Sequence, residues 1–265
     1  MRNPIARGWN VVDTSFRERP TDLLWVALGP YGFRRLLRDV RRERYRDFRI
    51  GRLHRERLSA LLEVPLQRVD ECLRECSGIA RELGEQWPGD LGNMGHLKGA
   101  LALYVITRLA RPERIVETGV ASGISTSFML EAVARNGVGS VISIDVKNAD
   151  NLHIPSARQT GWMIPERYRD RWRLVVGDSR EILDHILQEE RPIDLFLHDS
   201  LHTREHQCWE YERAWAALRP GGLLLSDNVE TGAFSEFCQR VGAQSAIVHS
   251  VWRGPKLGFC RKPRA

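Results

Sequence analysis

The chain concentrates acid–base and metal-ligand chemistry at the ends of two apolar runs. The first continues into "FLHDSLHT", residues 196–203, with Asp199 and His202, and the second into "LLLSDNV", with Asp227 and Asn228. Two carboxylates and an amide offer oxygen ligands, which Mg²⁺ and other hard divalent cations prefer. We therefore expect a metal site at Asp199, Asp227 and Asn228. An imidazole takes up a proton near neutral pH, so catalysis is assigned to His202 as general base, together with Asp199.

Each of these residues also has a plainer explanation. Acids that follow a strand often cap the next helix, and a loop histidine often holds its own backbone by a hydrogen bond. The stretch "HTREH", residues 202–206, also fits the H-x-x-E-H pattern of zinc peptidases. That pattern needs a long helix that begins before its first histidine, whereas here an apolar, strand-like run ends three or four residues earlier. The sequence favours the oxygen-ligand site over a zinc peptidase.

A glycine-containing turn, "VETGVASGIS", lies upstream of both runs. Gly119 and Gly123 let the backbone turn tightly, and a helix that begins there directs its N–H groups at a ligand. A dinucleotide-binding G-x-G-x-x-G turn would have glycines where this chain has Ala121 and Ile124. Glu117 would also repel a pyrophosphate. The turn therefore favours a ligand with a cationic end over a dinucleotide.

These motifs need a scaffold that brings them together, and the chain after residue 111 has the pattern of one. Apolar, strand-like runs alternate with helical segments, which is typical of a parallel sheet covered by helices on both faces. The runs are "RIVET", "SVISID", "WRLVVGD", "IDLFLH" and "GLLLSD". Two later runs, "QSAIVHSVW" and "KLGFCRK", are separated only by "RGP", which allows only an antiparallel hairpin. The predicted fold is α/β: a doubly wound, mostly parallel seven-stranded sheet with an antiparallel C-terminal hairpin and a helical N-terminal extension.

Ligands of such a sheet bind outside the carboxyl ends of its strands. An acid stands at that end of each predicted parallel strand: Glu117, Asp145, Asp178, Asp199 and Asp227. Helix capping alone does not readily explain an acid at every strand end. The sequence therefore predicts a ligand site along this edge.

The order and spacing of these motifs resemble those of class I S-adenosylmethionine-dependent methyltransferases, whose fold is Rossmann-like, over about residues 95–262. The resemblance implies S-adenosylmethionine as cofactor, with Asp145 on its ribose hydroxyls and Asp178 near its adenine. It places the cofactor-binding residues at Glu117, Gly119, Ala121, Ser122, Gly123, Asp145, Asp178 and Ser179. Ala121, where the family has its middle glycine, is a departure that leaves the cofactor room.

Three segments narrow the resemblance. "RIVETGVASGIS", "GWMIPERYRDRW" and "FLHDSLHT" with the later "LRPGG" look like the branch that contains the cephalosporin-biosynthesis and macrolide-sugar O-methyltransferases. The acid–acid–amide set looks like the metal triad of catechol-type O-methyltransferases, where the metal holds the acceptor oxygens and lowers their pKa. The resemblance implies methylation of a hydroxyl on a small natural-product or sugar-like acceptor. It also implies a cofactor-binding domain in residues 95–265. Residues 1–94 have a helical pattern of their own, and we expect this region to cover the cofactor, to help shape the acceptor pocket and to make any oligomer contacts.

The charge distribution leaves one alternative function open. The net charge is +6, and residues 34–57 hold eleven arginines against four acids. A patch of that kind would suit an RNA methyltransferase or another nucleic-acid-associated protein. Asp39, Glu43 and Asp47 interleave with the arginines, however, which favours a solvated helix face. The sequence has neither a signal-peptide pattern nor an apolar run of about 18 residues, so we expect no membrane span and a cytoplasmic protein. Homo-oligomerisation is left open.

Overall fold

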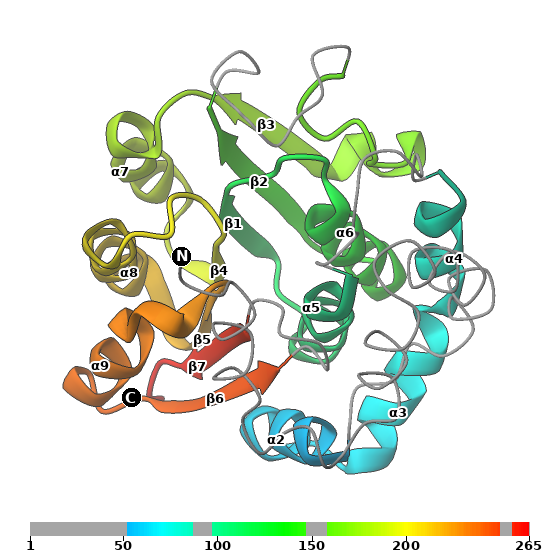
Figure 1. Cartoon of the computed structure of the whole chain (residues 1–265), viewed down its shortest axis with the longest axis horizontal. Coiled ribbons are helices and arrows are strands. Elements are labelled where there is room, and N and C mark those ends of the chain that lie inside the picture. The colour runs from blue at the N-terminus through cyan, green and yellow to red at the C-terminus, as the bar shows by residue number, and fades with distance from the viewer. Residues whose placement is uncertain (1–51, 87–96, 147–157, 250–255, 265) are drawn as a thin grey trace, which may run out of the picture. The chain divides into compact units, whose positions relative to one another are not determined.

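The computed structural model describes residues 52–86, 97–146, 158–249 and 256–264 (Figure 1). After residue 111 the described chain alternates strands and helices in the predicted order. All described residues fall within one compact unit, residues 49–265. The boundary expected between residues 94 and 95, and residues 34–51 of the arginine-rich segment, lie outside the described residues. The boundary and a nucleic-acid role for that segment therefore stay predictions.

The described strands form one seven-stranded sheet in the order β3-β2-β1-β4-β5-β7-β6 (Figure 1). They are β1 (Arg114–Thr118), β2 (Ser140–Asp145), β3 (Trp172–Val176), β4 (Ile193–His198), β5 (Leu218–Ser226), β6 (Gln244–His249) and β7 (Lys256–Arg261). β1 to β5 are parallel, whereas β7 runs antiparallel to both β5 and β6. The strand order reverses between β1 and β4, so the switch point lies between their carboxyl ends. The predicted sheet and its antiparallel C-terminal strands are confirmed.

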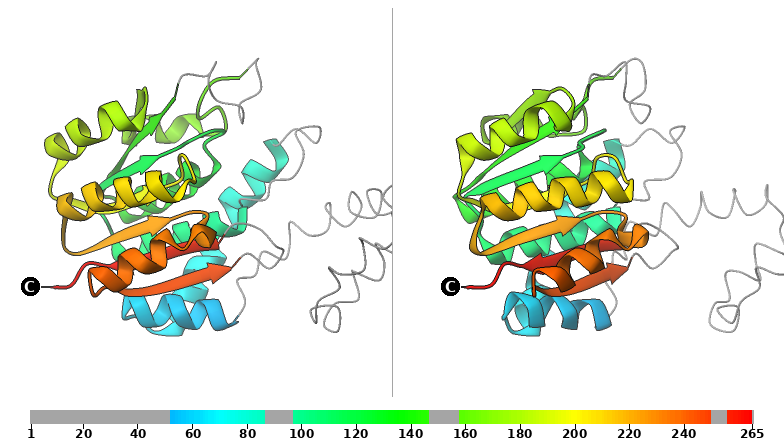
Figure 2. Two further views of the ribbon diagram at one scale, coloured as in Figure 1. Left: turned by 60° about the vertical axis from the view of Figure 1, so that its left-hand side comes forward. Right: turned by 90° about the vertical axis from the view of Figure 1, so that its left-hand side faces the viewer.

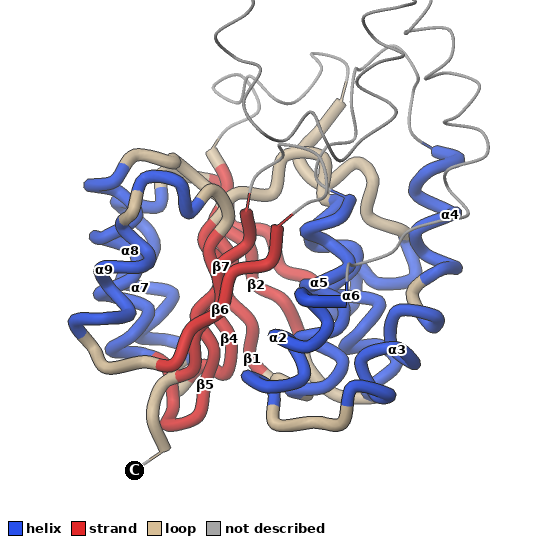
Figure 3. The backbone as a smooth tube through the Cα atoms, turned by 60° about the horizontal axis from the view of Figure 1, so that its bottom comes forward, coloured by secondary structure: helices blue, strands red, loops and turns tan. Residues whose placement is uncertain are grey.

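Helices cover both faces of this sheet. The described helices are α2 (Arg52–Leu62), α3 (Leu66–Glu75), α4 (Ser77–Gln86), α5 (Leu97–Ala110), α6 (Ile124–Asn136), α7 (Ser179–Glu190), α8 (Arg204–Ala217) and α9 (Ala233–Arg240), with short 3-10 helices η5 (Glu166–Arg171) and η6 (Val229–Thr231). α7, α8 and α9 lie side by side on one face (Figure 2). α2, α5 and α6 lie on the other, with α3 and α4 packed outside them (Figure 3). None of the helices in the described ranges combines the length and apolar character that a membrane span requires.

The strands are buried because their sequences are almost continuously apolar. In β4, Leu195, Phe196 and Leu197 are at most 1% exposed. Phe196 belongs to the same core cluster as Tyr211 of α8 and Phe237 of α9. Burial on both faces fixes the sheet between two layers of helices. The strand ends, from which the loops of the site emerge, are fixed with it.

The helical N-terminal extension is present in the described residues and is fastened to the C-terminal hairpin. A break at Pro65 separates α2 from α3, because proline lacks the N–H that a continuous helix needs. Arg57 of α2 donates from Nη1 to the carbonyl of Ile247 in β6 at 2.8 Å. Arg261 of β7 donates from Nη2 to the carbonyl of Leu61 at 3.0 Å. The extension and the sheet therefore pack as one unit.

Candidate active site

The carboxyl ends of β1, β4 and β5 lie next to one another. Their last residues, Thr118, His198 and Ser226, are register partners. The backbone continues this pairing into the loops, because the N–H of Asp199 donates to the carbonyl of Thr118 at 2.8 Å. The N–H of Asp227 donates in the same way to the carbonyl of His198 at 2.9 Å. The side chains of Asp199 and Asp227 therefore start from adjacent backbone positions.

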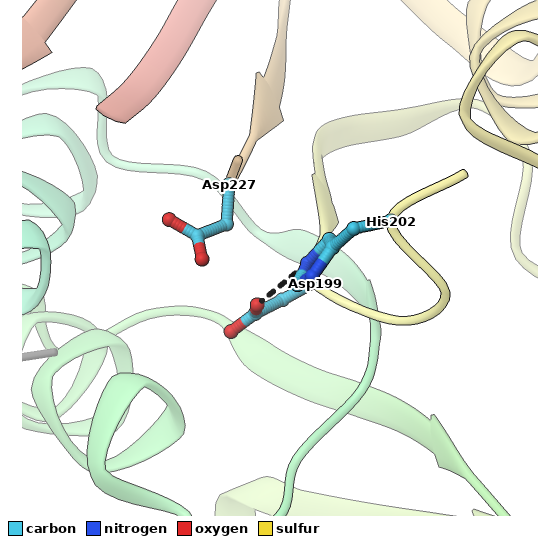
Figure 4. Close-up of side chains that lie close together, drawn as sticks. All are labelled: Asp199, His202 and Asp227. Atoms are coloured by element: carbon cyan, nitrogen blue, oxygen red, sulfur yellow. Dashed lines mark ion pairs between the residues drawn. The ribbon is translucent and has the colours of Figure 1, made fainter. Parts of the chain in front are cut away.

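Asp199, His202 and Asp227 converge from the ends of β4 and β5 (Figure 4). Each offers one potential metal-ligand atom, and these atoms lie within 4.8 Å of one another. Nε2 of His202 lies 3.4 Å from Oδ1 of Asp199. Burial, and next the negative charge of Glu117, raise the pKa of Asp199 to about 8. A divalent cation favours the ionised carboxylate, so this donor set fits the predicted metal.

Asn228 joins the cluster through His202. Its Nδ2 lies 2.7 Å from Nδ1 of His202. Since an amide nitrogen donates, this contact leaves the proton of a neutral His202 ring on Nε2, facing Asp199. Rotating the amide by half a turn would place Oδ1 opposite an Nδ1–H group and free Nε2 to accept a proton. Burial lowers the pKa of His202, which favours the neutral ring that a general base requires.

Helix capping does not account for Asp199, and the zinc-peptidase pattern does not match the geometry. The side chain that caps α8 belongs to Thr203, whose Oγ1 accepts from the N–H of His206 at 3.3 Å. His202 precedes α8, whereas His206 lies within it and turns its Nε2 to the buried Glu210 at 2.9 Å. A zinc-peptidase pair would instead present both histidines from one helix face.

The predicted glycine turn lies directly against the loop of Asp199. Gly119 has φ 85° and Gly123, which precedes α6, has φ 88°. A Cβ added at Gly119 would overlap the backbone carbonyl of Asp199, so only glycine allows this approach. Ala121 adopts φ 47°, a left-handed conformation that costs a non-glycine residue roughly 1–2 kcal/mol. Asp145 holds the turn in place, because its Oδ2 accepts from the N–H of Ala121 at 2.8 Å.

Glu117 is fully buried beneath this turn. Its Oε1 accepts from the hydroxyls of Thr126, at 2.7 Å, and Ser143. Its Oε2 is also buried and has no hydrogen-bond partner among the described residues. Burial raises the pKa of Glu117 to about 7, although the two hydroxyl bonds act in the opposite direction. A buried hydrogen-bond acceptor of this kind fits a ligand that brings a positively charged hydrogen-bond donor.

The remaining predicted cofactor residues lie around the same edge with structural partners of their own. Asp178 is exposed and caps α7, accepting from the N–H of Arg180 at 2.8 Å. Ser179 is buried, and its Oγ lies 3.1 Å from Nε2 of His206. The carbonyl of Ser122 accepts from the N–H of Met163 at 2.9 Å. Their contacts with a cofactor stay predictions.

Two residues of α8 that the sequence motifs did not indicate form hydrogen bonds with the segments that carry the site. Gln207 donates from Nε2 to the carbonyls of Asp227 and Asn228, at 3.4 and 3.1 Å. Glu210 accepts hydrogen bonds from four side chains around the strand ends. Both residues are fully buried. The available signal was the polar composition of the inner face of α8, where an amphipathic helix would carry apolar residues.

Comparisons with known proteins agree with this fold. Residues 116–229 match the family described as "Methyltransferase domain". A putative caffeoyl-CoA O-methyltransferase from Staphylococcus aureus is 14% identical, with a TM-score of 0.51 over 70% of this chain and 91% of that one. A SAM-dependent O-methyltransferase from Thermotoga maritima is 17% identical, with a TM-score of 0.51 over 69% of this chain and 72% of that one. No protein of curated function matches in sequence. Residues 116–229 therefore match a methyltransferase domain, and the fold is shared with these two structures, in agreement with the resemblance found in the sequence.

Proposed function

We propose that the protein transfers the methyl group of S-adenosylmethionine to a hydroxyl oxygen of a small natural-product or sugar-like acceptor, with a divalent cation at the site. The observation that carries this proposal is the contact between the glycine turn and the cluster of Asp199, His202 and Asp227. It supports a donor-binding role for the turn and an acceptor-activating role for the cluster, because both adjoin the switch point of the sheet. The printed names of the Staphylococcus and Thermotoga proteins, both O-methyltransferases, support the same reaction.

On the donor side, Glu117, the turn and Asp145 form the binding surface. When bound, S-adenosylmethionine supplies a methyl group on a positively charged sulfur, which an acceptor oxygen displaces in line. Oε2 of Glu117 offers a buried acceptor for the cationic end of the donor. Asp145 stabilises the turn and lies at the position proposed for the ribose hydroxyls. Ser122, Asp178 and Ser179 complete the proposed surface.

On the acceptor side, Asp199, Asp227 and Asn228 would hold the divalent cation, Mg²⁺ in the first instance. A bound cation lowers the pKa of an acceptor hydroxyl. The raised pKa of Asp199 supports this assignment, because a carboxyl group that resists ionisation alone gains most from a cation. His202 is the proposed general base and would accept the hydroxyl proton on Nε2, in the neutral form that carries its ring proton on Nδ1.

The described end of the arginine-rich segment supports a small acceptor rather than a nucleic acid. Nη1 of Arg55 pairs with Oδ1 of Asp70. Arg57 donates to the backbone of β6. Guanidinium groups already engaged within the fold are less available for phosphates.

Ligand binding tests the donor assignment. S-adenosylhomocysteine should raise the melting temperature and bind in calorimetry, whereas NAD should do neither. His202→Ala should keep its affinity for S-adenosylhomocysteine and lose roughly 10²–10⁴-fold in methyl transfer, the usual contribution of a general base. Absence of binding by the wild-type protein at millimolar S-adenosylhomocysteine would contradict the proposal. Full turnover in His202→Ala would remove His202 as the base.

A further inference from the structure

A single buried carboxylate lies beneath both halves of the site. Glu210 of α8 is fully buried. Its Oε2 accepts from Oγ1 of Thr118 and lies next to Nδ1 of His198, each at 2.6 Å. Its Oε1 accepts from Oγ of Ser200 and lies next to Nε2 of His206, each at 2.9 Å. The four groups come from three separate elements: β1, β4 with its following loop, and α8 itself.

The partners of Glu210 adjoin residues that the proposed function uses. Thr118 immediately precedes Gly119 of the donor turn, and His198 and Ser200 flank Asp199. His206 extends the network to Ser179 at the start of α7. One carboxylate therefore joins the donor turn to the loop that carries Asp199 and His202.

This arrangement is costly if it serves packing alone. Burying a carboxylate opposes folding unless hydrogen bonds replace its hydration. Burial would raise the pKa of Glu210, but hydrogen bonds from His198, His206 and Thr118 hold it well below the ordinary range. The next residue, Tyr211, shows that this part of α8 also packs by an aromatic ring in the core. An ionised group is therefore retained where an apolar one would fill the same interior.

We propose that Glu210 is a positioning residue that fixes the Asp199–His202 loop relative to the donor turn. The inference rests on the proposed function. Glu210 does not touch donor, cation or acceptor; it acts through Thr118 on the donor side, and through His198 and Ser200 on the cation side. Loss of its charge and of one acceptor oxygen should loosen both sides together.

The inference can be tested by measuring how tightly the Glu210→Gln variant binds two probes. S-adenosylhomocysteine is followed by calorimetry and Mn²⁺ by electron paramagnetic resonance. The affinity for Mn²⁺ should fall roughly 10–100-fold, as it does when groups that orient metal ligands are removed, and the affinity for S-adenosylhomocysteine should fall with it. Glu210→Asp, which keeps the charge, should restore part of the loss. Glu75→Gln is the matched control, because Glu75 joins α3 to α5 by accepting from Tyr104 and Arg108.

Two variants that each remove one partner of Glu210 distinguish its effect on the donor turn from its effect on the Asp199–His202 loop. They also replace Glu210→Gln if that variant does not fold. Thr118→Val should weaken S-adenosylhomocysteine more than Mn²⁺, and Ser200→Ala should do the reverse. Hydrogen exchange should accelerate in residues 117–123 and 196–203 of each Glu210 variant, relative to Glu75→Gln.

A purely structural Glu210 would give a lower melting temperature with both affinities and both exchange rates unchanged relative to Glu75→Gln, which overturns the inference. If the wild-type protein binds neither probe, the proposed function fails. The exchange rates then still decide whether Glu210 orders the two loops.

Discussion

Among single residues, Glu117 is the group whose protonation should depend most clearly on the proposed methyl donor. One of its oxygens is satisfied by Thr126 and Ser143, while the other is buried without a hydrogen-bond partner among the described residues. Burial raises its pKa from 4.5 to about 7. The empty protein therefore binds a proton that a cationic ligand should displace.

We accordingly expect the affinity for S-adenosylhomocysteine to rise with pH up to about 7 and then to level off. Below that pH, Glu117 must lose its proton before it can pair with the ligand's ammonium group. Calorimetry in buffers of different ionisation enthalpy should show proton release. Glu117→Gln should bind more weakly and with a flatter pH dependence; a wild-type affinity independent of pH would contradict the assignment.

At the scale of elements, the site depends on how closely the turn after β1 approaches the loop after β4. The approach is possible because Gly119 has no Cβ. The hydrogen bond from the backbone N–H of Asp199 to the carbonyl of Thr118 sets the distance between the strand ends. Sequence predicted a tight turn at this position. It did not predict that the turn packs on Asp199, because that contact depends on the pairing of β1 with β4.

Gly119→Ala tests this contact, with Gly137→Ala as its control. Both glycines have positive φ, 85° and 72°, so each substitution should cost roughly 1–2 kcal/mol of backbone strain. A Cβ at Gly137 meets nothing within 4 Å, whereas one at Gly119 overlaps the Asp199 carbonyl. Gly119→Ala should therefore lose more stability in urea unfolding and also lose S-adenosylhomocysteine binding. Equal stability and binding of the two variants would refute the contact.

For the whole molecule, stability and ligand binding should be linked through two acids whose pKa values are raised. The pKa of Glu117 is raised from 4.5 to about 7, and that of Asp199 from 3.8 to about 8. The folded empty protein therefore holds more protons than the unfolded chain until the pH passes these values, and its stability falls as pH rises. His202, with a lowered pKa, acts in the opposite direction only below about 6.5, where the unfolded chain gains protons.

The melting temperature of the empty protein should fall between about pH 6.5 and 8. Asp199→Asn should reduce that fall, because it removes the carboxyl group with the highest of these pKa values. Mg²⁺ with S-adenosylhomocysteine should also reduce it, since ligands that favour the ionised acids stabilise the folded state. A melting temperature that rises across this window would contradict the raised pKa values.

The sheet, its antiparallel end and the site edge could be predicted because they follow from local patterns. Apolar runs alternate with helices, and an acid ends each parallel strand. The proximity of Asp199, His202, Asp227 and Asn228 was predicted in this way, and their roles stay predictions. Glu210 and Gln207 could not be found, because their roles depend on which face of α8 meets the strand ends. The contact between Asn228 and His202 likewise depends on a left-handed backbone at Asn228.

Cation-assisted methylation of a hydroxyl can be tested by following a labelled methyl group from S-adenosylmethionine to a panel of small hydroxylated acceptors, before and after removal of divalent cations. We expect the label in an ether on the acceptor, loss of transfer on chelation, and recovery on addition of Mg²⁺. Methyl transfer by the Asp227→Ala variant should not recover on addition of Mg²⁺. Methyl transfer to nitrogen or carbon would contradict the proposed function. So would transfer to oxygen at a rate that neither chelation nor Asp227→Ala changes.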